Sequence, residues 1–378
     1  MDLPKPDPDL AHLADVVPSV LSAMGADDFD RPIPLRDGIT GACVLLVDGL
    51  GAELLDTYAD DAPVLAGLRS NTLQVGFPST TAAGLAAVGT GRHSGEHGMV
   101  GLSFRLPGGE VMNALSWRPH PKGSDLRDKA VPEQVQPLPT TFERAAGAGI
   151  AVSVISGAEF SHSGLTRAVL RGARYVGVHA LGDLAAGVQA ALADGGFCYG
   201  YHSELDLLGH VYGPGSAAWR MQLRQVDRLV ESIVEALPPD SLLAVVADHG
   251  MVAVEASDTV DIDTSPPLLD GVAAIGGEPR ARHVYVDDGA LDSVLAAWRE
   301  SLASQAWVAS RDEAIAAGWF GERVSDDVRL RIGDIVAAAR GATGLMRRTV
   351  EPLLSSLIGQ HGSLTTAEQR IPLLLAYG

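Results

Sequence analysis

The stretch Ala42-Cys43-Val44-Leu45-Leu46-Val47-Asp48-Gly49 places an uninterrupted apolar run directly before an acidic residue and a glycine. A short run without polar alternation is typical of a strand that is buried on both faces. Such strands belong to sheets that helices cover on both sides. The stretch therefore predicts an interior strand that ends at Asp48.

Apolar runs of similar length recur along the whole chain, separated by longer stretches suited to helices. Further strands are expected at 72–77, 151–155, 174–178, 197–201, 242–247, 282–286 and 371–376. Apolar residues spaced three and four apart predict helices at 216–236 and 289–304. This alternation predicts an α/β fold in which a mostly parallel central sheet lies between two layers of helices.

The chain has 378 residues, enough for one large domain with an insertion. We expect a core formed by residues 1–255 and 345–378, with a smaller inserted subdomain at 256–344. The segment 101–137 is rich in glycine, proline and charge and reads as a long loop near the site. Loops of this length often act as functional lids. The alternative is a surface loop without a functional role.

The formal net charge of −19 argues against one class of partner, nucleic acid. Binding to duplex nucleic acid draws its affinity from clustered cationic side chains, so no such binding is expected here.

The segment Met1–Asp9 contains prolines and acids where a secretory signal would carry basic and then apolar residues, which predicts a cytoplasmic location. No apolar stretch reaches the length of a membrane span.

Acidic and histidine side chains follow two of the predicted strands. Asp48 ends the first, and Asp248-His249-Gly250 follows the run at 242–247. Ligands of open α/β sheets bind outside the carboxyl ends of the strands, so these side chains should converge at one edge. Glycine after each group lets the backbone turn there.

Two further places complete a candidate metal centre. Asp206 and His210 stand four residues apart and share one face if the segment is helical, and His361 lies in a late loop. Three carboxylates and three neutral imidazoles would leave two divalent cations with one uncompensated positive charge. An ionised hydroxyl would balance such a site.

Thr81 is the candidate hydroxyl, because it lies at the start of an Ala-rich helical stretch after Phe77-Pro78-Ser79-Thr80. Coordination to a divalent ion can activate a threonine hydroxyl as a nucleophile, and a helix N-terminus favours the resulting negative charge. The alternative is an ordinary helix cap, since Ser and Thr are preferred at that position.

Together these motifs resemble the alkaline phosphatase superfamily, and within it the bacterial nucleotide pyrophosphatase/phosphodiesterase branch. The family pattern is matched in order from the first strand to the C-terminal region. The matching segments are Val47-Asp48-Gly49, Pro78-Ser79-Thr80-Thr81, Tyr201 with Asp206, Gly209, His210, Gly213 and Pro214, Asp248-His249-Gly250-Met251, and His361-Gly362.

The resemblance implies an alkaline-phosphatase-like three-layer fold with two zinc ions, manganese or iron being the alternative metals. One ion would be held by Asp206, His210 and His361. The other would be held by Asp48, Asp248, His249 and the Thr81 oxygen. The implied reaction cleaves a phosphodiester or pyrophosphate bond of a small phosphate ester, a nucleotide among the candidates, through a phospho-threonine intermediate.

One position departs from the family pattern. Relatives place an asparagine three residues after the nucleophile to hold a phosphoryl oxygen, and this chain has Gly84 there. Asn113 is a candidate substitute. Trp117 is a candidate wall for the leaving group, with ordinary packing as the alternative.

Three alternatives to a diesterase stay open. The same metal site would serve a phosphomonoesterase or a phosphonate hydrolase. From another class, the chain would be a catalytically inactive protein that binds metal or a nucleotide.

Overall fold

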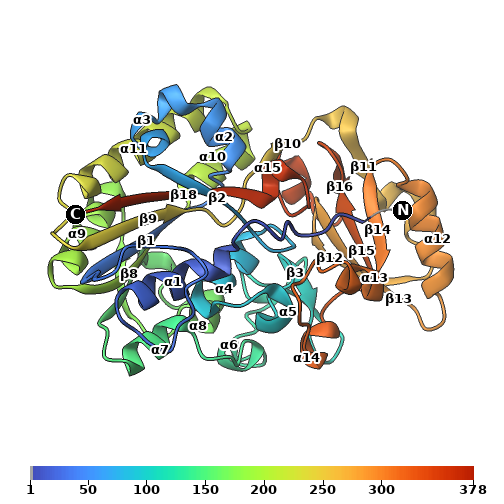
Figure 1. Cartoon of the computed structure of the whole chain (residues 1–378). Helices are drawn as coiled ribbons and strands as arrows, with labels where there is room; N and C mark the ends of the chain where they lie inside the picture. The colour runs from blue at the N-terminus through green and yellow to red at the C-terminus, as the bar shows by residue number, and fades with distance from the viewer. Residues whose placement is uncertain (1–2) are drawn as a thin grey trace.

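A seven-stranded sheet forms the centre of the molecule (Figure 1). The structure is a computed structural model that describes residues 3–378. Six strands are parallel, and the β18 strand runs antiparallel between β2 and β9. In sheet order the strands are β2 (Arg69–Gln74), β18 (Arg370–Tyr377), β9 (Ser241–Val246), β1 (Gly41–Val47), β8 (Gly196–His202), β6 (Val152–Gly157) and β7 (Arg174–Val178).

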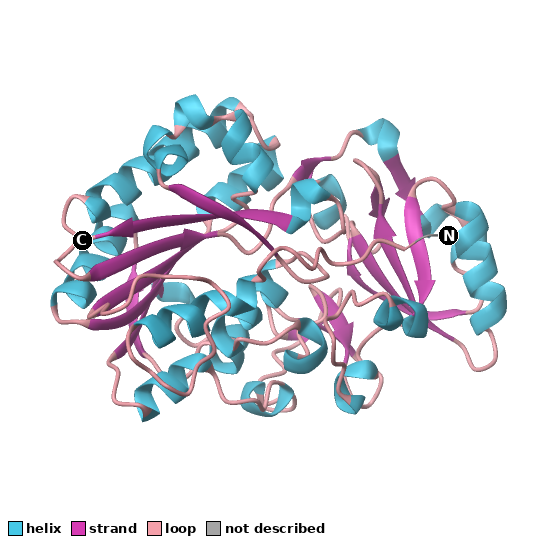
Figure 2. Cartoon of the chain, in the orientation of Figure 1, coloured by secondary structure: helices cyan, strands magenta, loops and turns pink. Residues whose placement is uncertain are grey.

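Helices cover both faces of this sheet, which makes the three layers that the sequence predicts (Figures 1 and 2). Every residue of β1 and β9 is buried, as their unbroken apolar runs require. One layer holds α2 (Ala52–Thr57), α3 (Pro63–Gly67), α9 (Leu181–Ala193), α10 (Glu204–Tyr212) and α11 (Ala217–Val234). The other holds α1 (Val16–Ala23), α4 (Thr81–Thr90), α7 (Thr141–Gly147) and α8 (Gly164–Val169).

Three adjacent parallel strands, β9, β1 and β8, end at the same edge of the sheet. Val47 pairs with His202, and Leu46 pairs with Val246. Their carboxyl ends therefore lie side by side, and the residues that follow them meet there. The prediction of an α/β fold with a mostly parallel sheet is confirmed.

A second hydrophobic core lies in the part of the chain between Ile262 and Leu345. Its antiparallel sheet consists of β12 (Val272–Glu278), β13 (Ala281–Val286), β15 (Ile335–Ala339) and β14 (Ala306–Ser310). Helix α12 (Leu291–Ser301) contributes Val294 and Trp298 to this core. The helix lies at the far right of Figure 1. The boundaries of the inserted subdomain stay a prediction.

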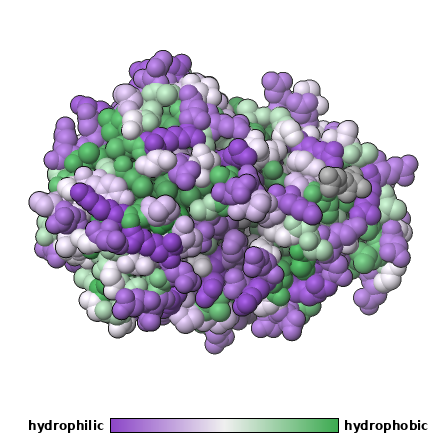
Figure 3. All heavy atoms as spheres, viewed as in Figure 1, coloured by the Kyte–Doolittle hydropathy of each residue, from purple (hydrophilic) through white to green (hydrophobic). Residues whose placement is uncertain are grey.

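Short elements connect the two cores. Strand β10 (Val252–Ala253) pairs with β17 (Gly359–Gln360), and β11 (Thr259–Asp261) pairs with β16 (Gly344–Met346). The remaining helices are α5 (Ser94–His97), α6 (Pro132–Val135), α13 (Arg311–Ala316), α14 (Asp326–Arg329) and α15 (Thr366–Gln369). On the face shown in Figure 3, hydrophilic residues dominate and hydrophobic residues form patches between them.

The interpretation of 101–137 as an irregular loop was wrong. The segment forms a three-stranded antiparallel sheet of β3 (Ser103–Arg105), β4 (Val111–Asn113) and β5 (Arg118–Pro119), followed by α6. Phe104 and Met112 lie opposite each other in β3 and β4 and are fully buried. The strands are too short for a periodic pattern, and the intervening glycines and prolines hid them.

In residues 3–378 we find no helix that is both long and apolar enough to cross a membrane.

Candidate metal centre

Two buried carboxylates lie where β1 and β9 end. Asp48 follows β1, and Asp248 stands two residues beyond β9. The Tyr201 hydroxyl donates to Asp48 Oδ2 at 2.5 Å, and the Gly49 amide donates to Asp248 Oδ1 at 3.2 Å. Burial, with repulsion from Asp248 and Asp206, raises the pKa of Asp48 well above its ordinary value. A divalent cation would relieve this repulsion.

Helix α10 carries the next pair on one face. Asp206 Oδ2 lies 3.3 Å from His210 Nε2, one helical turn away. Burial opposes ionisation of Asp206, but the field of His210 and the other two histidines outweighs it and holds the pKa of this carboxyl below its usual value. Gly213, with a φ of 87°, caps the helix three residues after His210.

Three histidines are oriented by backbone carbonyls. The Nδ1 atom of His210 lies 2.7 Å from Gly359 O, and that of His361 lies 2.9 Å from Ser79 O. His249 Nδ1 lies 3.0 Å from its neighbour's carbonyl. Because a carbonyl only accepts, each Nδ1 carries the proton, which leaves Nε2 with a lone pair. Such orienting bonds are typical of histidines that ligate metals.

The Nε2 atoms of His210 and His361 lie 3.2 Å apart. Two lone pairs this close repel each other unless a proton or a metal ion lies between them. Three carboxylate oxygens in the same region are buried without a hydrogen-bond partner among the described residues: Asp48 Oδ1, Asp206 Oδ1 and Asp248 Oδ2. Buried polar atoms are normally satisfied, so this donor set fits bound cations.

The structure brings all six predicted carboxylate and imidazole ligands together. Two groups offer ligand atoms within 4.8 Å of one another, namely Asp206 with His249 and His361, and Asp48 with Asp248 and His249. The prediction paired Asp206 and His361 with His210, and the distances of His210 to both are short. His249 belongs to both groups and stacks on His361, with 3.6 Å between ring centroids.

Thr81 is the first residue of α4, and its Oγ1 lies 3.3 Å from His249 Nε2. The helix-cap position belongs to Thr80, whose side chain makes no capping bond. The Thr80 hydroxyl donates instead to Glu278 Oε2 at 2.8 Å. The Thr81 hydroxyl therefore faces the histidine that the two ligand groups share, and it is not a cap.

Gly84 lies against the backbone of Asp248. A Cβ atom at position 84 would lie 2.4 Å from Asp248 Cβ and 3.0 Å from its Cα. No larger residue fits there unless Asp248 moves. The asparagine that relatives carry at this position is thus excluded by the packing of α4 on the end of β9.

The two residues predicted to contact the substrate, Trp117 and Asn113, make hydrogen bonds within the protein. Trp117 is 1% exposed, and its indole N–H donates to Ala130 O, so ordinary packing accounts for its position. Asn113 Oδ1 accepts from the amides of Leu115 and Ser116 and closes a local turn. The structure shows no contact between Asn113 and the carboxylate and histidine cluster.

Two residues near the cluster received no role from the sequence. Tyr201 was visible as part of a motif, yet its bond to Asp48 depends on the register of β1 and β8. Glu278 carries no signal at all, because it lies 198 positions from Thr80, its hydrogen-bond partner. Only the fold brings the end of β12 beside residues 78–81, which include the predicted nucleophile Thr81.

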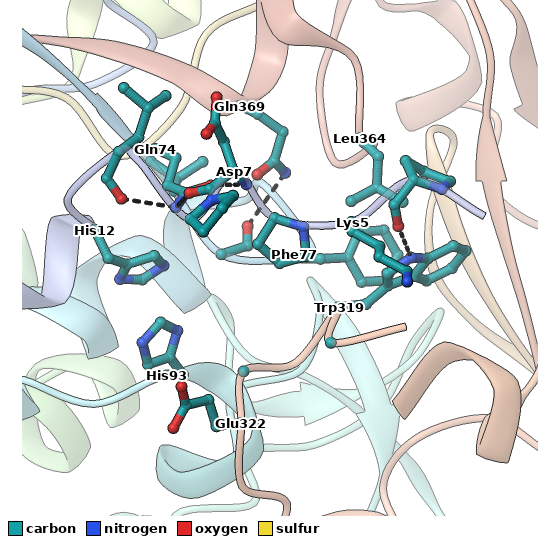
Figure 4. A pocket seen from close by; sticks show the side chains of 18 of the residues that line it. Lys5, Asp7, His12, Gln74, Phe77, His93, Trp319, Glu322, Leu364 and Gln369 are labelled. Carbon is teal, nitrogen blue, oxygen red and sulfur yellow. Dashed lines mark hydrogen bonds between the residues drawn. The ribbon is translucent and has the colours of Figure 1, made fainter. Parts of the chain in front are cut away.

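A separate cavity of about 700 Å³ lies beside the N-terminal residues 4–10, which we call the N-terminal arm (Figure 4). Gln74 and Phe77 line it together with residues of the arm, and Figure 4 shows the rings of His12 and His93 facing each other there. Their centroids are 4.0 Å apart. None of the predicted metal ligands lines this cavity, so it is separate from the carboxylate and histidine cluster.

Comparison with known proteins gives a match to the type I phosphodiesterase / nucleotide pyrophosphatase family over residues 42–364. A curated protein, GPI ethanolamine phosphate transferase 3 of Eremothecium gossypii, is 38% identical over 52 residues. These are 14% of this chain and 5% of that protein. The chain thus spans a small fraction of the length of this relative.

Solved structures share the fold over most of the chain. Murine ectonucleotide pyrophosphatase / phosphodiesterase 5 superposes with a TM-score of 0.69 at 16% identity, covering 89% of this chain and 88% of that one. An inactive variant of that protein, in complex with AMP, gives a TM-score of 0.67 at 16% identity over the same shares. Phosphonoacetate hydrolase from Sinorhizobium meliloti 1021, in complex with phosphonoformate, gives 0.67 at 19% identity, covering 89% and 90%.

Proposed function

The chain belongs to the type I phosphodiesterase / nucleotide pyrophosphatase family, and from this premise we propose that it hydrolyses phosphodiester or pyrophosphate bonds with Thr81 as nucleophile. Membership makes it a phosphoric ester hydrolase. The proposal adds two bound metal ions, a phospho-threonine intermediate and a small phosphate ester, such as a nucleotide, as substrate. A cytoplasmic location stays a prediction.

The donor set supports zinc. Asp206, His210 and His361 would hold one ion, and Asp48, Asp248, His249 and the Thr81 oxygen would hold the other. Mixed imidazole and carboxylate ligands suit zinc, with manganese and iron as alternatives. Bound ions would favour ionisation of the Thr81 hydroxyl and neutralise charge on the phosphoryl and leaving oxygens.

The single observation that carries the proposal is the position of Thr81 Oγ1, 3.3 Å from His249 Nε2 at the first turn of α4. The helix N-terminus favours negative charge on this oxygen. The carbonyl bond of His249 and its stacking on His361 fix the orientation of the ring that the hydroxyl faces.

The reaction proceeds in two displacements. The Thr81 hydroxyl gives up its proton to solvent, and Oγ1 forms a bond to phosphorus while the bond to the leaving oxygen breaks and the leaving group departs as its anion. Water then attacks the same phosphorus, the bond to Thr81 Oγ1 breaks, and a proton of that water returns to Oγ1. The Tyr201 bond holds Asp48 in place throughout, and the carbonyl bonds of the histidines fix their ring orientations.

The test uses Thr81→Ala and Thr81→Ser with bis-p-nitrophenyl phosphate, the p-nitrophenyl ester of thymidine monophosphate, and p-nitrophenyl phosphate. We expect the zinc-loaded protein to cleave the diesters and Thr81→Ala to lose at least about 10³-fold in kcat/KM. Thr81→Ser, which keeps a hydroxyl, should retain part of the rate. Cleavage of the monoester alone would refute the diester assignment.

Gly84 favours a second candidate with the same metal site, a phosphomonoesterase or phosphonate hydrolase. The chain lacks the amide that relatives aim at a phosphoryl oxygen, and Asp248 fills the space where it would lie. Phosphonoacetate in the same assay separates this candidate. An inactive protein that binds metal or nucleotide would show unchanged, negligible rates in the wild type and in Thr81→Ala.

A further inference from the structure

Glu278 is a buried carboxyl that the proposed chemistry leaves without a role. It ends β12 and is 3% exposed. Its Oε2 accepts from the Thr80 hydroxyl at 2.8 Å and from the Leu102 amide at 3.3 Å. The second core thereby reaches the residue that directly precedes the proposed nucleophile.

The same carboxyl also packs on the segment that carries His361. A Cβ atom at Gly362 would lie 2.8 Å from Glu278 Cγ and 3.2 Å from Oε1. Gly362 has a φ of 130°, which side chains rarely adopt. Glu278 therefore lies between the turn of residues 78–81, which we call the nucleophile turn, and the loop that carries His361.

Oxygen Oε1 of Glu278 is buried with no hydrogen-bond partner in residues 3–378. The inward oxygens of Asp48, Asp206 and Asp248 share this condition. The arginines nearest in sequence are engaged elsewhere. Arg280 pairs with Glu368 at 2.6 Å, and Arg282 pairs with Glu351 at 2.9 Å.

Burial without a paired cation raises the pKa of Glu278 to about 8. Because Oε2 already accepts two hydrogen bonds, the proton of the neutral acid lies on Oε1. A buried donor left without a partner loses the hydrogen bond that it would make in water. A bound ligand that offers an oxygen would replace that bond.

We propose that Glu278 Oε1 contacts a non-bridging oxygen of the bound phosphoryl group and takes over the work of the amide that Gly84 cannot provide. The proposal rests on the function proposed above. Glu278 donates one hydrogen bond and keeps its proton, so no bond to hydrogen breaks. Glu278 would thus make the phosphoryl contact that the sequence analysis assigned to Asn113.

Two substitutions separate this contact from packing. Glu278→Gln keeps the shape and offers an amide donor, whereas Glu278→Leu keeps the volume and removes the donor. Loss of one such donor typically lowers the rate about 10²–10³-fold. We expect that loss in kcat/KM for Glu278→Leu, with a weaker inhibition by orthophosphate, and a rate within about 5-fold of wild type for Glu278→Gln.

Thr80→Val is the matched control, because it removes the hydrogen bond to Oε2 and leaves Oε1 in place. If Glu278 acts only by bracing the nucleophile turn, Thr80→Val will reproduce the loss seen in Glu278→Leu. The proposal requires a loss under about 10-fold, which is the usual scale for one neutral hydrogen bond. Zinc content and circular dichroism are measured on every variant.

The outcomes are distinct. A rate for Glu278→Leu within 3-fold of wild type, an equal loss in Glu278→Gln, or loss of zinc from either variant overturns the contact. If Glu278→Leu does not fold, Glu278→Asp replaces it, because withdrawing the carboxyl by one methylene should cost about 10-fold or more. An unchanged rate in Glu278→Asp is then the refuting result. Failure of the proposed function shows separately, as absent diester cleavage by the wild type.

Discussion

Adding a single methyl group at Gly84 should damage the candidate metal centre although residue 84 binds nothing itself. The Cβ of Gly84→Ala would lie 2.4 Å from Asp248 Cβ and 3.2 Å from Asp248 O. Ordinary contacts between carbon atoms are about 3.5–4.0 Å, so Asp248 or α4 must shift by roughly 1 Å. Overpacking of this kind typically destabilises a protein by about 1–3 kcal/mol.

The effect on melting temperature follows from chain length. With about 2.1 cal/mol/K of unfolding entropy per residue, 378 residues give roughly 0.8 kcal/mol/K, so Tm should fall by about 1–4 °C. The functional loss should be larger, because Asp248 would carry its ligand oxygen out of position. A 1 Å misplacement at a reacting centre can cost about 10²-fold in rate.

Gly182→Ala is the matched control, since Gly182 lies within α9 and a Cβ there would meet nothing within 4 Å. Alanine in an open helical position stabilises by roughly 0.5–1 kcal/mol, so this variant should melt at or above wild type. Urea unfolding in EDTA, zinc competition and diester cleavage are measured on both variants. A Gly84→Ala protein as stable and as active as Gly182→Ala would refute the packing account.

Two further predictions concern the groups around the metal ligands. Tyr201→Phe removes the hydrogen bond to Asp48 Oδ2. Loss of a bond that supports a metal ligand typically lowers metal affinity, so the zinc affinity should fall about 10–100-fold while the circular dichroism spectrum stays unchanged. Equal zinc affinity of the variant and the wild type in a chelator competition would contradict this. The pKa of Glu278 is raised from 4.5 to about 8, so its contribution to stability is complete below pH 4.5 and is lost as pH rises through about 8. In EDTA the unfolding free energy of the wild type should therefore fall across this range, and Glu278→Gln should flatten the fall; identical slopes would show that Glu278 does not titrate there.

The central sheet and its ligand edge were predictable because their causes are local. The runs that became β1 and β9 are apolar throughout, and the polar residues that end them had to lie at the same edge of a parallel sheet. The direction of β18 was not predictable, since an apolar run has the same pattern in either orientation. The short strands of 101–137 were missed because no periodic signal develops over two or three residues.

Only those residues of the candidate site that belong to sequence motifs were predictable. Asp206 and His210 are linked by helical spacing, and the structure places them 3.3 Å apart. The role proposed for Glu278 depends on the contact between a hairpin of the second core and the nucleophile turn, and no sequence pattern records that contact. The burial of Trp117 has the same origin, because it depends on packing against distant segments.

The central claim is that Thr81 attacks phosphorus and carries the phosphoryl group before water displaces it. A double displacement keeps the configuration at phosphorus, whereas direct attack by water inverts it. The most direct measurement is therefore the stereochemical course of hydrolysis of a single phosphorothioate diastereomer of the thymidine monophosphate p-nitrophenyl ester in ¹⁸O-labelled water. We predict retention of configuration, and inversion would contradict the account.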